Sequence, residues 1–178
     1  GGPSGGGRIA RKGSTPFMLA ADTADTPFMR LLVELGADPF ITNVDGCTPL
    51  MAAAGLGTRS ADEEAGTEDE AVEAVEYLLG LGADINTVSN FGDTAMHGAA
   101  FANFPKVVKV LAAKGAKIEV WNQKNKRGWT PLLIAEGHRF GNFKPSFETI
   151  EAIKEVMLAN GVTPPPPTPP IPVKGYGN

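Results

Sequence analysis

Apolar residues recur along this chain in two kinds of segment, one short and rich in alanine, the other longer and amphipathic. The alanine-rich kind occupies residues 15–21, 48–54, 94–100 and 130–135, and each copy begins with threonine. Three of the four copies continue with proline. A threonine hydroxyl caps the free N–H groups of a helix start, and proline suits the first helical position. Each segment therefore predicts a helix that begins directly after its threonine.

A second apolar pattern follows each alanine-rich segment, with the spacing of one helix face. In the first three copies its residues are Phe28, Met29, Leu31, Leu32 and Leu35; Val72, Val75, Leu78 and Leu79; and Val107, Val108, Val110 and Leu111. Gly36, Gly82, Gly115 and Gly161 lie just beyond, where a left-handed residue that ends a helix is favoured. The sequence thus predicts four helix pairs, each ended by glycine.

The helix pairs share a common repeat length. Thr15 and Thr48 are 33 residues apart, and the other units are longer by insertions of 13 residues at 57–69, 10 at 137–146 and 3 in the turn that ends at Gly128. Insertions between such segments belong in loops, which tolerate changes of length. The units are 8–46, 47–92, 93–128 and 129–162. One helix pair cannot bury both of its faces alone, so we expect neighbouring units to stack.

These features resemble the ankyrin-repeat family, which has the same unit length and a Thr-Pro-Leu-His-x-Ala signature. The resemblance covers about residues 8–162 and implies an all-α solenoid of stacked helix pairs joined by β-hairpin or turn fingers. The chain departs from the signature at Ala95, which replaces proline, and keeps the histidine only at His97. In the family this histidine ties backbone groups together, so we expect a structural role for His97.

The two ends of the array differ. The last predicted helix, 147–159, has apolar residues on one face and Glu148, Glu151, Lys154 and Glu155 on the other. The first unit has little polar face, although terminal repeats normally need one. We therefore expect the N-terminal end to be covered by a preceding repeat, another domain or another subunit.

The segments that flank the array have biased compositions. Residues 1–7 are rich in glycine and predict a flexible linker. Residues 163–178 form a proline-rich tail, which predicts an extended spacer or a ligand for another domain. The chain opens without methionine or a signal peptide, which suggests a fragment or processed product.

Composition excludes several classes of protein. The chain is 42% hydrophobic with a formal net charge of −4, as is usual for a globular protein, and no apolar run is long enough to span a bilayer. A lone Cys47, expected to be partly exposed on a turn, excludes an internal disulfide framework. The compartment stays open: the family is intracellular by default, but extracytoplasmic bacterial examples exist.

Charge is distributed unevenly along the chain. The acidic residues of the second unit are Asp62, Glu63, Glu64, Glu68, Asp69, Glu70, Glu73 and Glu76, and the basic residues of the third and fourth are Lys106, Lys109, Lys114, Lys117, Lys124, Lys126, Arg127, Arg139 and Lys144. Such a distribution can steer an acidic protein partner, or it can be a well-solvated lysine face. Nucleic-acid binding is disfavoured, because no reading helix or stacking platform accompanies the lysines.

No constellation for catalysis, metal binding or cofactor binding is evident. Cys47 has no base or orienting group, His138 has no nearby cysteine or paired carboxylate at ligand spacing, and no glycine-rich nucleotide loop occurs. We therefore predict that the chain is not an enzyme and has no catalytic, cofactor-binding or metal-binding residue.

The resemblance also implies where a protein partner binds. In the family, contacts come from positions just before the cap threonine and just after the alanines, on the concave surface of fingers and inner helices. Mapped onto this chain they are Val44, Asp45, Asn90, Phe91, Asp93, Phe101, Lys126, Arg127, Trp129, His138 and Arg139. Trp121 and Trp129 are each either packing residues or interface anchors, and Trp129 is the better anchor. The first hypothesis is a protein-binding module; the alternative is a scaffold segment of a larger chain or assembly, packed through its N-terminal end.

Overall fold

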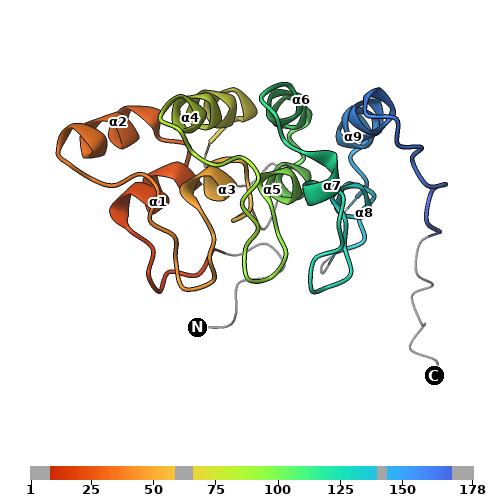
Figure 1. Cartoon of the computed structure of the whole chain (residues 1–178), viewed down its shortest axis with the longest axis horizontal. Helices are drawn as coiled ribbons and strands as arrows, with labels where there is room; N and C mark the ends of the chain where they lie inside the picture. The colour runs from red at the N-terminus through yellow and green to blue at the C-terminus, as the bar shows by residue number, and fades with distance from the viewer. Residues whose placement is uncertain (1–8, 59–65, 140–143, 170–178) are drawn as a thin grey trace.

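The computed structural model describes residues 9–58, 66–139 and 144–169, which form a row of stacked helix pairs (Figure 1). Within these ranges the regular secondary structure is helical, without strands. The inner helices are α1 (Pro16–Asp22), α3 (Pro49–Ala53), α5 (Ala95–Ala102) and α8 (Pro131–Ala135). The outer helices are α2 (Thr26–Glu34), α4 (Glu68–Gly80), α6 (Pro105–Ala113) and α9 (Phe147–Ala159), and α7 (Ile118–Trp121) is a single turn after α6. The predicted all-α solenoid is confirmed.

The inner helices begin where the cap threonines stand. The hydroxyl oxygens of Thr15, Thr48 and Thr130 accept hydrogen bonds from the backbone N–H three residues later, at 3.1, 3.2 and 3.3 Å. Each such cap stabilises its helix by about 1 kcal/mol. At Thr94 the hydroxyl instead lies 3.0 Å from Nδ1 of His97, so the histidine takes part in this helix start.

The outer helices end as predicted. Gly36, Gly82, Gly115 and Gly161 have φ of 91°, 100°, 103° and 73°, the left-handed region in which glycine avoids the steric penalty of a side chain. After Gly82, the N–H of Ala83 returns to the carbonyl of Leu78 at 3.1 Å, which satisfies an acceptor left free at the helix end.

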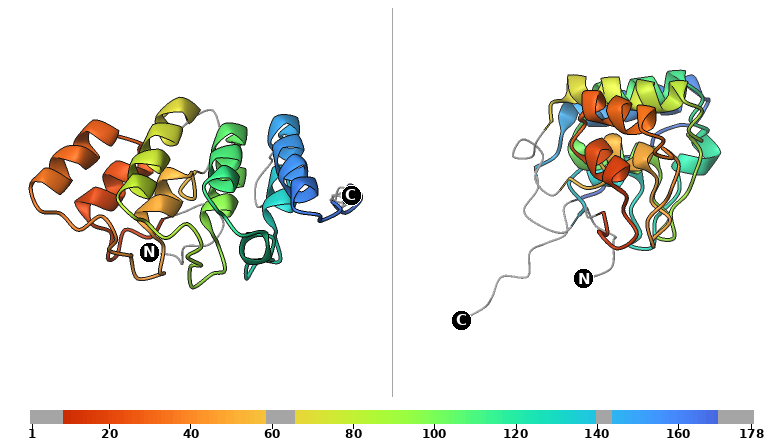
Figure 2. Two further views of the ribbon diagram at one scale, coloured as in Figure 1. Left: turned by 45° about the horizontal axis from the view of Figure 1, so that its top comes forward. Right: turned by 90° about the vertical axis from the view of Figure 1, so that its left-hand side faces the viewer.

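The helices stack in two layers. Inner helices contact inner helices in the order α1, α3, α5, α8, and outer helices contact outer ones in the order α2, α4, α6, α9. Seen along the stack, the outer helices form one layer, the inner helices a second, and the turns between units extend beyond the inner layer (Figure 2). The core lies between the layers, and the alanines of α3 and α5 are buried in it.

The approach between α3 and α5 is close enough to require glycine. A Cβ at Gly98 would lie 3.0 Å from the carbonyl oxygen of Met51 and 2.9 Å from the backbone nitrogen of Leu56. Both atoms belong to the backbone of the preceding unit and cannot turn aside as a side chain would.

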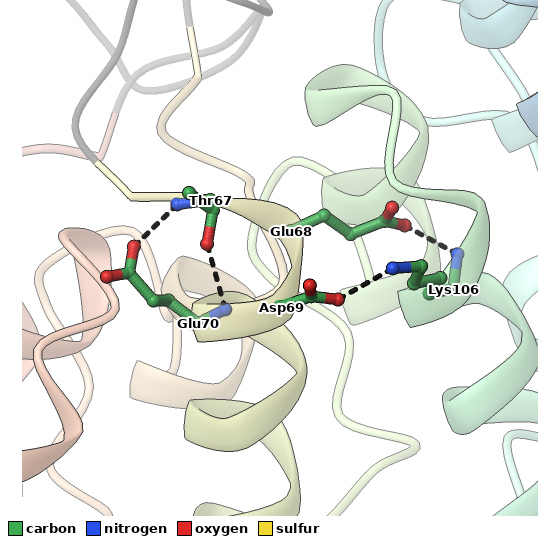
Figure 3. Close-up of polar contacts among 5 residues, drawn as sticks. All are labelled: Thr67, Glu68, Asp69, Glu70 and Lys106. Carbon is green, nitrogen blue, oxygen red and sulfur yellow. Dashed lines mark hydrogen bonds and ion pairs between the residues drawn. The ribbon is translucent and has the colours of Figure 1, made fainter.

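Two predicted segments differ from the structure or lie outside it. Glu68 and Asp69 were expected in the loop insertion 57–69, but they form the first turn of α4, because Thr67 and Glu70 build a capping box there (Figure 3). The Thr67 N–H donates to the Glu70 carboxylate at 2.7 Å, and the Glu70 N–H donates to the Thr67 hydroxyl at 3.2 Å. The linker 1–7, Asp62 to Glu64, and residues 170–178 of the tail lie outside the described residues; residues 163–169 have no regular secondary structure.

Candidate protein-binding surface

Three turns between units are closed by a polar side chain that binds its own backbone. Oδ1 of Asn43 accepts from the N–H groups of Asp45 and Cys47, both at 3.0 Å. Oδ1 of Asn125 accepts from Arg127 and Trp129 at 3.0 and 3.1 Å. In the middle turn the Ser89 hydroxyl oxygen accepts hydrogen bonds from the N–H groups of residues 91 and 93. We call residues 10–14, 43–47, 89–93 and 125–129 the four fingers.

Successive fingers are joined by one backbone hydrogen bond each, always at the same place in the turn. Val44 donates to the carbonyl of Lys12 at 3.2 Å, Asn90 to Asp45 at 2.9 Å, and Lys126 to Phe91 at 2.8 Å. The fingers therefore form one continuous finger edge in register rather than four independent loops. The sequence predicted the turns, but glycine and asparagine patterns alone could not give the bonds between turns far apart in the chain.

Cations lie over aromatic rings at the fourth finger. The Lys126 ammonium is 5.7 Å from the centre of the Phe91 ring, and the Arg127 guanidinium is 5.7 Å from that of Trp129. Lys126 is exposed, and the other three side chains are half-buried. A cation held over a ring at an exposed site stabilises by about 0.5–1 kcal/mol. The arrangement presents positive charge beside flat apolar surface.

The ring of Trp129 packs against a buried side chain. It meets Phe101 of α5 edge to face, with ring centres 6.3 Å apart, and the Arg139 guanidinium lies 5.8 Å from the Phe101 ring and donates to the Phe101 carbonyl. Phe101 is 2% exposed and Arg139 9%, and burial lowers the pKa of Arg139 to about 10. The expectation that Phe101 and Arg139 contact a partner needs correction, because both are buried, with Trp129 and Arg139 of the fourth unit packed on Phe101.

Asp93 needs the same correction. It is 3% exposed, and its carboxylate accepts a hydrogen bond from Nδ2 of Asn125 at 2.8 Å. Burial raises the pKa of Asp93, against the opposing effects of Asn125 and Arg127. Asp93 thus lies behind the finger edge and joins the third finger to the fourth.

The remaining predicted residues reach the surface to different degrees. Val44 is 50% exposed, Asn90 is exposed, and Asp45 is half-buried. These residues lie together, since Nδ2 of Asn90 donates to the Val44 carbonyl at 3.3 Å. His138 is half-buried and has Nε2 3.9 Å from the Glu136 carboxylate.

His97 has the structural role expected of it. Its Nδ1 accepts from the N–H of Thr94 at 3.2 Å, so the proton of the neutral ring must be on Nε2, which lies 3.1 Å from the carbonyl of Gln123. Burial lowers the pKa of His97 to about 4, which keeps the ring neutral at physiological pH. The ring therefore ties α5 to the segment that leads into the fourth finger.

Cys47 and Trp121 are core residues. Cys47 was expected to be partly exposed but is 2% exposed, because the second finger turns its thiol inward. Burial, followed by the charges of Asp93 and Asp45, raises the pKa of Cys47 to about 12, so the thiol is neutral. Trp121 is equally buried, which favours packing over an anchor role. Among the described residues, no group of three or more His, Cys, Asp or Glu side chains is placed to hold a metal ion.

The acidic first turn of α4 binds the neighbouring unit. The Glu68 carboxylate accepts from the backbone N–H of Lys106, and the Lys106 ammonium lies 2.7 Å from Asp69 (Figure 3). Since the N-cap residue of α6, Phe104, has no side-chain oxygen, Glu68 supplies a cap from another helix. Sequence reasoning missed this role; a proline at the start of α6 without a capping residue before it was the available signal.

Comparison with known proteins agrees with the repeat geometry. The family described as Ankyrin repeats (3 copies) matches residues 65–144, and the family described as Ankyrin repeat matches residues 12–44. Together these matches span more than half of the chain. Along the residues that the structure describes, no helix has both the length and the apolar composition to cross a bilayer.

Several much longer proteins share this similarity. The chain is 32% identical to neurogenic locus notch homolog protein 1 of Xenopus tropicalis over 146 residues, which are 70% of the chain and 6% of that protein. It is 28% identical to the human SH3 and multiple ankyrin repeat domains protein 2 over 156 residues, 76% of the chain and 8% of that protein. The chain thus spans less than a tenth of the length of these two relatives.

Proposed function

Because this chain belongs to the ankyrin-repeat family, whose repeats generally mediate protein–protein interaction, we propose that it is a protein-binding module that uses the concave surface of its fingers and inner helices. The observation that carries the proposal is the finger edge, in which Val44, Asn90 and Lys126 occupy equivalent positions and each donates a backbone hydrogen bond to the preceding finger. A surface fixed in this way loses little conformational freedom when a partner binds, which favours affinity.

The partner that fits this surface is acidic. Lys126 and Arg127 lie over aromatic rings at the fourth finger, and Arg11 and Lys12 of the first finger are exposed. The finger edge therefore carries positive charge at both ends, and a partner with carboxylates at this spacing gains from both. Such charge speeds association and selects partners more than it adds affinity.

A charge-matched pair of variants tests the proposal. Lys126→Glu changes the finger edge, and Lys114→Glu makes the same change of charge at the end of α6, on the outer layer; both side chains are exposed. Proteins captured by each immobilised chain are identified and quantified by mass spectrometry at two salt concentrations. We expect Lys126→Glu to lose acidic proteins that the wild-type and Lys114→Glu chains retain, with the larger effect at low salt. Equal capture by all three chains contradicts the proposal.

The function proposed here is contact without catalysis. The two most buried reactive groups, the Cys47 thiol and the His97 ring, are both neutral and both engaged in packing or backbone bonds. Neither is placed to act on a substrate, and the family is typically a non-enzymatic interaction module. The proposal includes no cofactor or metal.

A second candidate function is a structural one, in which the chain is a scaffold segment packed through its N-terminal end. The observation that favours it is the exposure of Leu19, Phe28 and Leu31 on the first helix pair, at 47%, 43% and 46%. Large apolar side chains gathered at one end of a protein mark a site of association. At the other end, α9 buries Ile150 and Ile153 and exposes Glu148 and Glu151.

A further inference from the structure

The exposed residues of the first helix pair occupy positions that the later units bury. Leu19 is the fourth residue after its cap threonine, and the equivalent residues are Ala52, Gly98 and Ile134. Ala52 and Ile134 are each 1% exposed, and Gly98 is buried too. At Gly98 the missing Cβ would point at backbone atoms of Met51 and Leu56, which belong to the unit before it. This position of an inner helix therefore faces the preceding unit.

The outer helix repeats the relationship. Phe28 lies eight residues before the glycine that ends its helix, and the equivalent residues are Ala74, Val107 and Ile153, all fully buried. Leu31 is equivalent to Tyr77, whose ring lies 4.3 Å beneath the guanidinium of Arg30 on the preceding outer helix. Leu31 thus occupies the position at which Tyr77 contacts the preceding outer helix.

The comparison also separates this face from ordinary surface exposure. Leu35 is 75% exposed, but its equivalent in the third unit is Lys114, which is exposed as well. Leu35 therefore occupies a position that stacking leaves in water. We restrict the face to Leu19, Phe28 and Leu31 and call it the leading face.

The first finger contacts the second finger in the same register in which the later fingers contact one another. The Lys12 carbonyl accepts from the N–H of Val44 as the carbonyls of Asp45 and Phe91 accept from the next fingers. The turn bond of the first finger, from the Ser14 N–H to the Arg11 carbonyl at 3.0 Å, lies one residue later than the turn bonds of the other fingers. The second, third and fourth fingers each connect an outer helix to the inner helix after it. The first finger is thus placed to make the same connection.

From these relationships we propose that the leading face docks one further helix pair of the ankyrin type, which precedes α1 in the polypeptide, stacks in the same register and is joined through the first finger. Small residues of its inner helix would pack against Leu19. A long polar side chain of its outer helix would lie over Leu31, as Arg30 lies over Tyr77. The inference rests on the second candidate function and specifies what is packed. Two copies meeting face to face fit less well, because a two-fold axis would not continue the finger edge.

A fusion that supplies such a helix pair tests the proposal. A copy of residues 93–124, which contains α5 and α6, replaces residues 1–9, so that the native first finger joins it to α1. Docking onto the leading face should add helical circular dichroism and raise the midpoint of thermal unfolding by about 5 °C or more, since three large apolar side chains leave water. The fusion should stay monomeric in light scattering.

Face variants show whether any gain comes from the leading face. Leu19→Lys with Leu31→Lys should remove the gain in the fusion and change the midpoint of the unfused chain by much less than that gain, because these side chains are only 47% and 46% exposed there and keep their remaining contacts in both chains. Leu35→Lys is the matched control and should keep the gain. A fusion without added helical signal or a higher midpoint, or a gain that survives the face variant, overturns the proposal.

Light scattering on the unfused chain separates this proposal from the function on which it rests. Suppose that the unfused chain forms dimers, that the face variant is monomeric, and that the fusion gains neither helical signal nor a higher midpoint. A second copy of the chain then covers the leading face, so the docking of a helix pair is wrong and the scaffold function stands. An unfused chain that stays monomeric at high concentration, together with a fusion that gains nothing, contradicts both.

Discussion

The amide of Asn125 donates a hydrogen bond to the carboxylate of Asp93 at 2.8 Å, and both residues are buried where the third finger meets the fourth. The same Asn125 side chain closes its own turn through Oδ1. One side chain thus fixes the shape of a finger and its attachment to the finger before it. This double role makes Asn125 the residue on which the fourth finger most depends.

Replacement of Asn125 by Ala should therefore lower the free energy of unfolding by about 2–4 kcal/mol, because it removes three hydrogen bonds and leaves a buried carboxylate without its amide donor. Asn90→Ala is the matched control, since that exposed amide makes one bond of 3.3 Å to a carbonyl and should change stability by less than about 1 kcal/mol. Urea denaturation followed by circular dichroism measures both. Equal losses in the two variants would contradict the assigned roles.

His97 should make the stability of the fold depend on pH in the mildly acidic range. Its pKa is lowered from an ordinary value of 6.5 to about 4 by burial, so the unfolded chain binds a proton more readily than the folded one. The stability that the neutral ring contributes is complete above pH 6.5 and is lost as the pH falls toward 4. Integrated over that range, the loss is about 3 kcal/mol.

Denaturation curves at several pH values check this expectation. The wild-type chain should lose stability steadily between pH 6.5 and 4, and His97→Ala, less stable at neutral pH, should lose much less over the same range. The raised pKa of the buried Asp93 has the opposite effect on stability, because its ionisation opposes folding as the pH rises. The effect of His97 is therefore obtained from the difference between the two chains and not from the wild-type chain alone. Parallel pH profiles would show that the ring titrates normally in the folded state.

Local patterns were enough to predict the four helix pairs and their stacking, but not the single turn α7. The cap threonines and ending glycines act within one turn of their own helix, so Thr15, Thr48, Gly36 and Gly82 could be assigned without knowing any distant contact. The expected role of His97 came from the family signature, and the structure confirms it.

The candidate binding surface was harder to predict, because exposure depends on what a neighbouring unit covers. Phe101 follows the alanines of its helix as a contact residue would, yet Trp129 and Arg139, 28 and 38 residues later, bury it. The loop expected at Glu68 is wrong because the capping box of Thr67 and Glu70 begins α4 there, a local signal, whereas the bond from the Lys106 N–H to Glu68 has no signal in that segment. The burial of Phe101 and the bond from Lys106 to Glu68 are both contacts between units, which periodicity does not encode.

Gly98 and Gly80 should respond oppositely to the same substitution. Gly98→Ala places a methyl group against two backbone atoms of the preceding unit at 2.9 and 3.0 Å, so we expect a loss of about 2 kcal/mol or more. At Gly80, the last residue of α4, an added Cβ meets nothing within 4 Å, and Ala should stabilise the helix by about 0.5–1 kcal/mol. Thermal unfolding of the two variants distinguishes a packing requirement from helix propensity, and a stabilised Gly98→Ala chain would refute the close approach of α3 and α5.

Glu68 should matter more to stability than its neighbour Asp69, although Asp69 makes the ion pair. The Glu68 carboxylate caps the first turn of α6 by accepting from a backbone N–H, and removal of such a cap by Ala lowers stability by about 1 kcal/mol. The pair of Asp69 with Lys106 lies in water, where ions screen it and side-chain entropy offsets it, so Asp69→Ala should have the smaller effect and one that disappears at high salt. Hydrogen exchange at the amides of α6 provides the decisive measurement, because loss of the Glu68 cap should speed exchange at residues 106–108 while Asp69→Ala leaves it unchanged. If both variants speed exchange equally, the ion pair and not the cap holds α6 against α4.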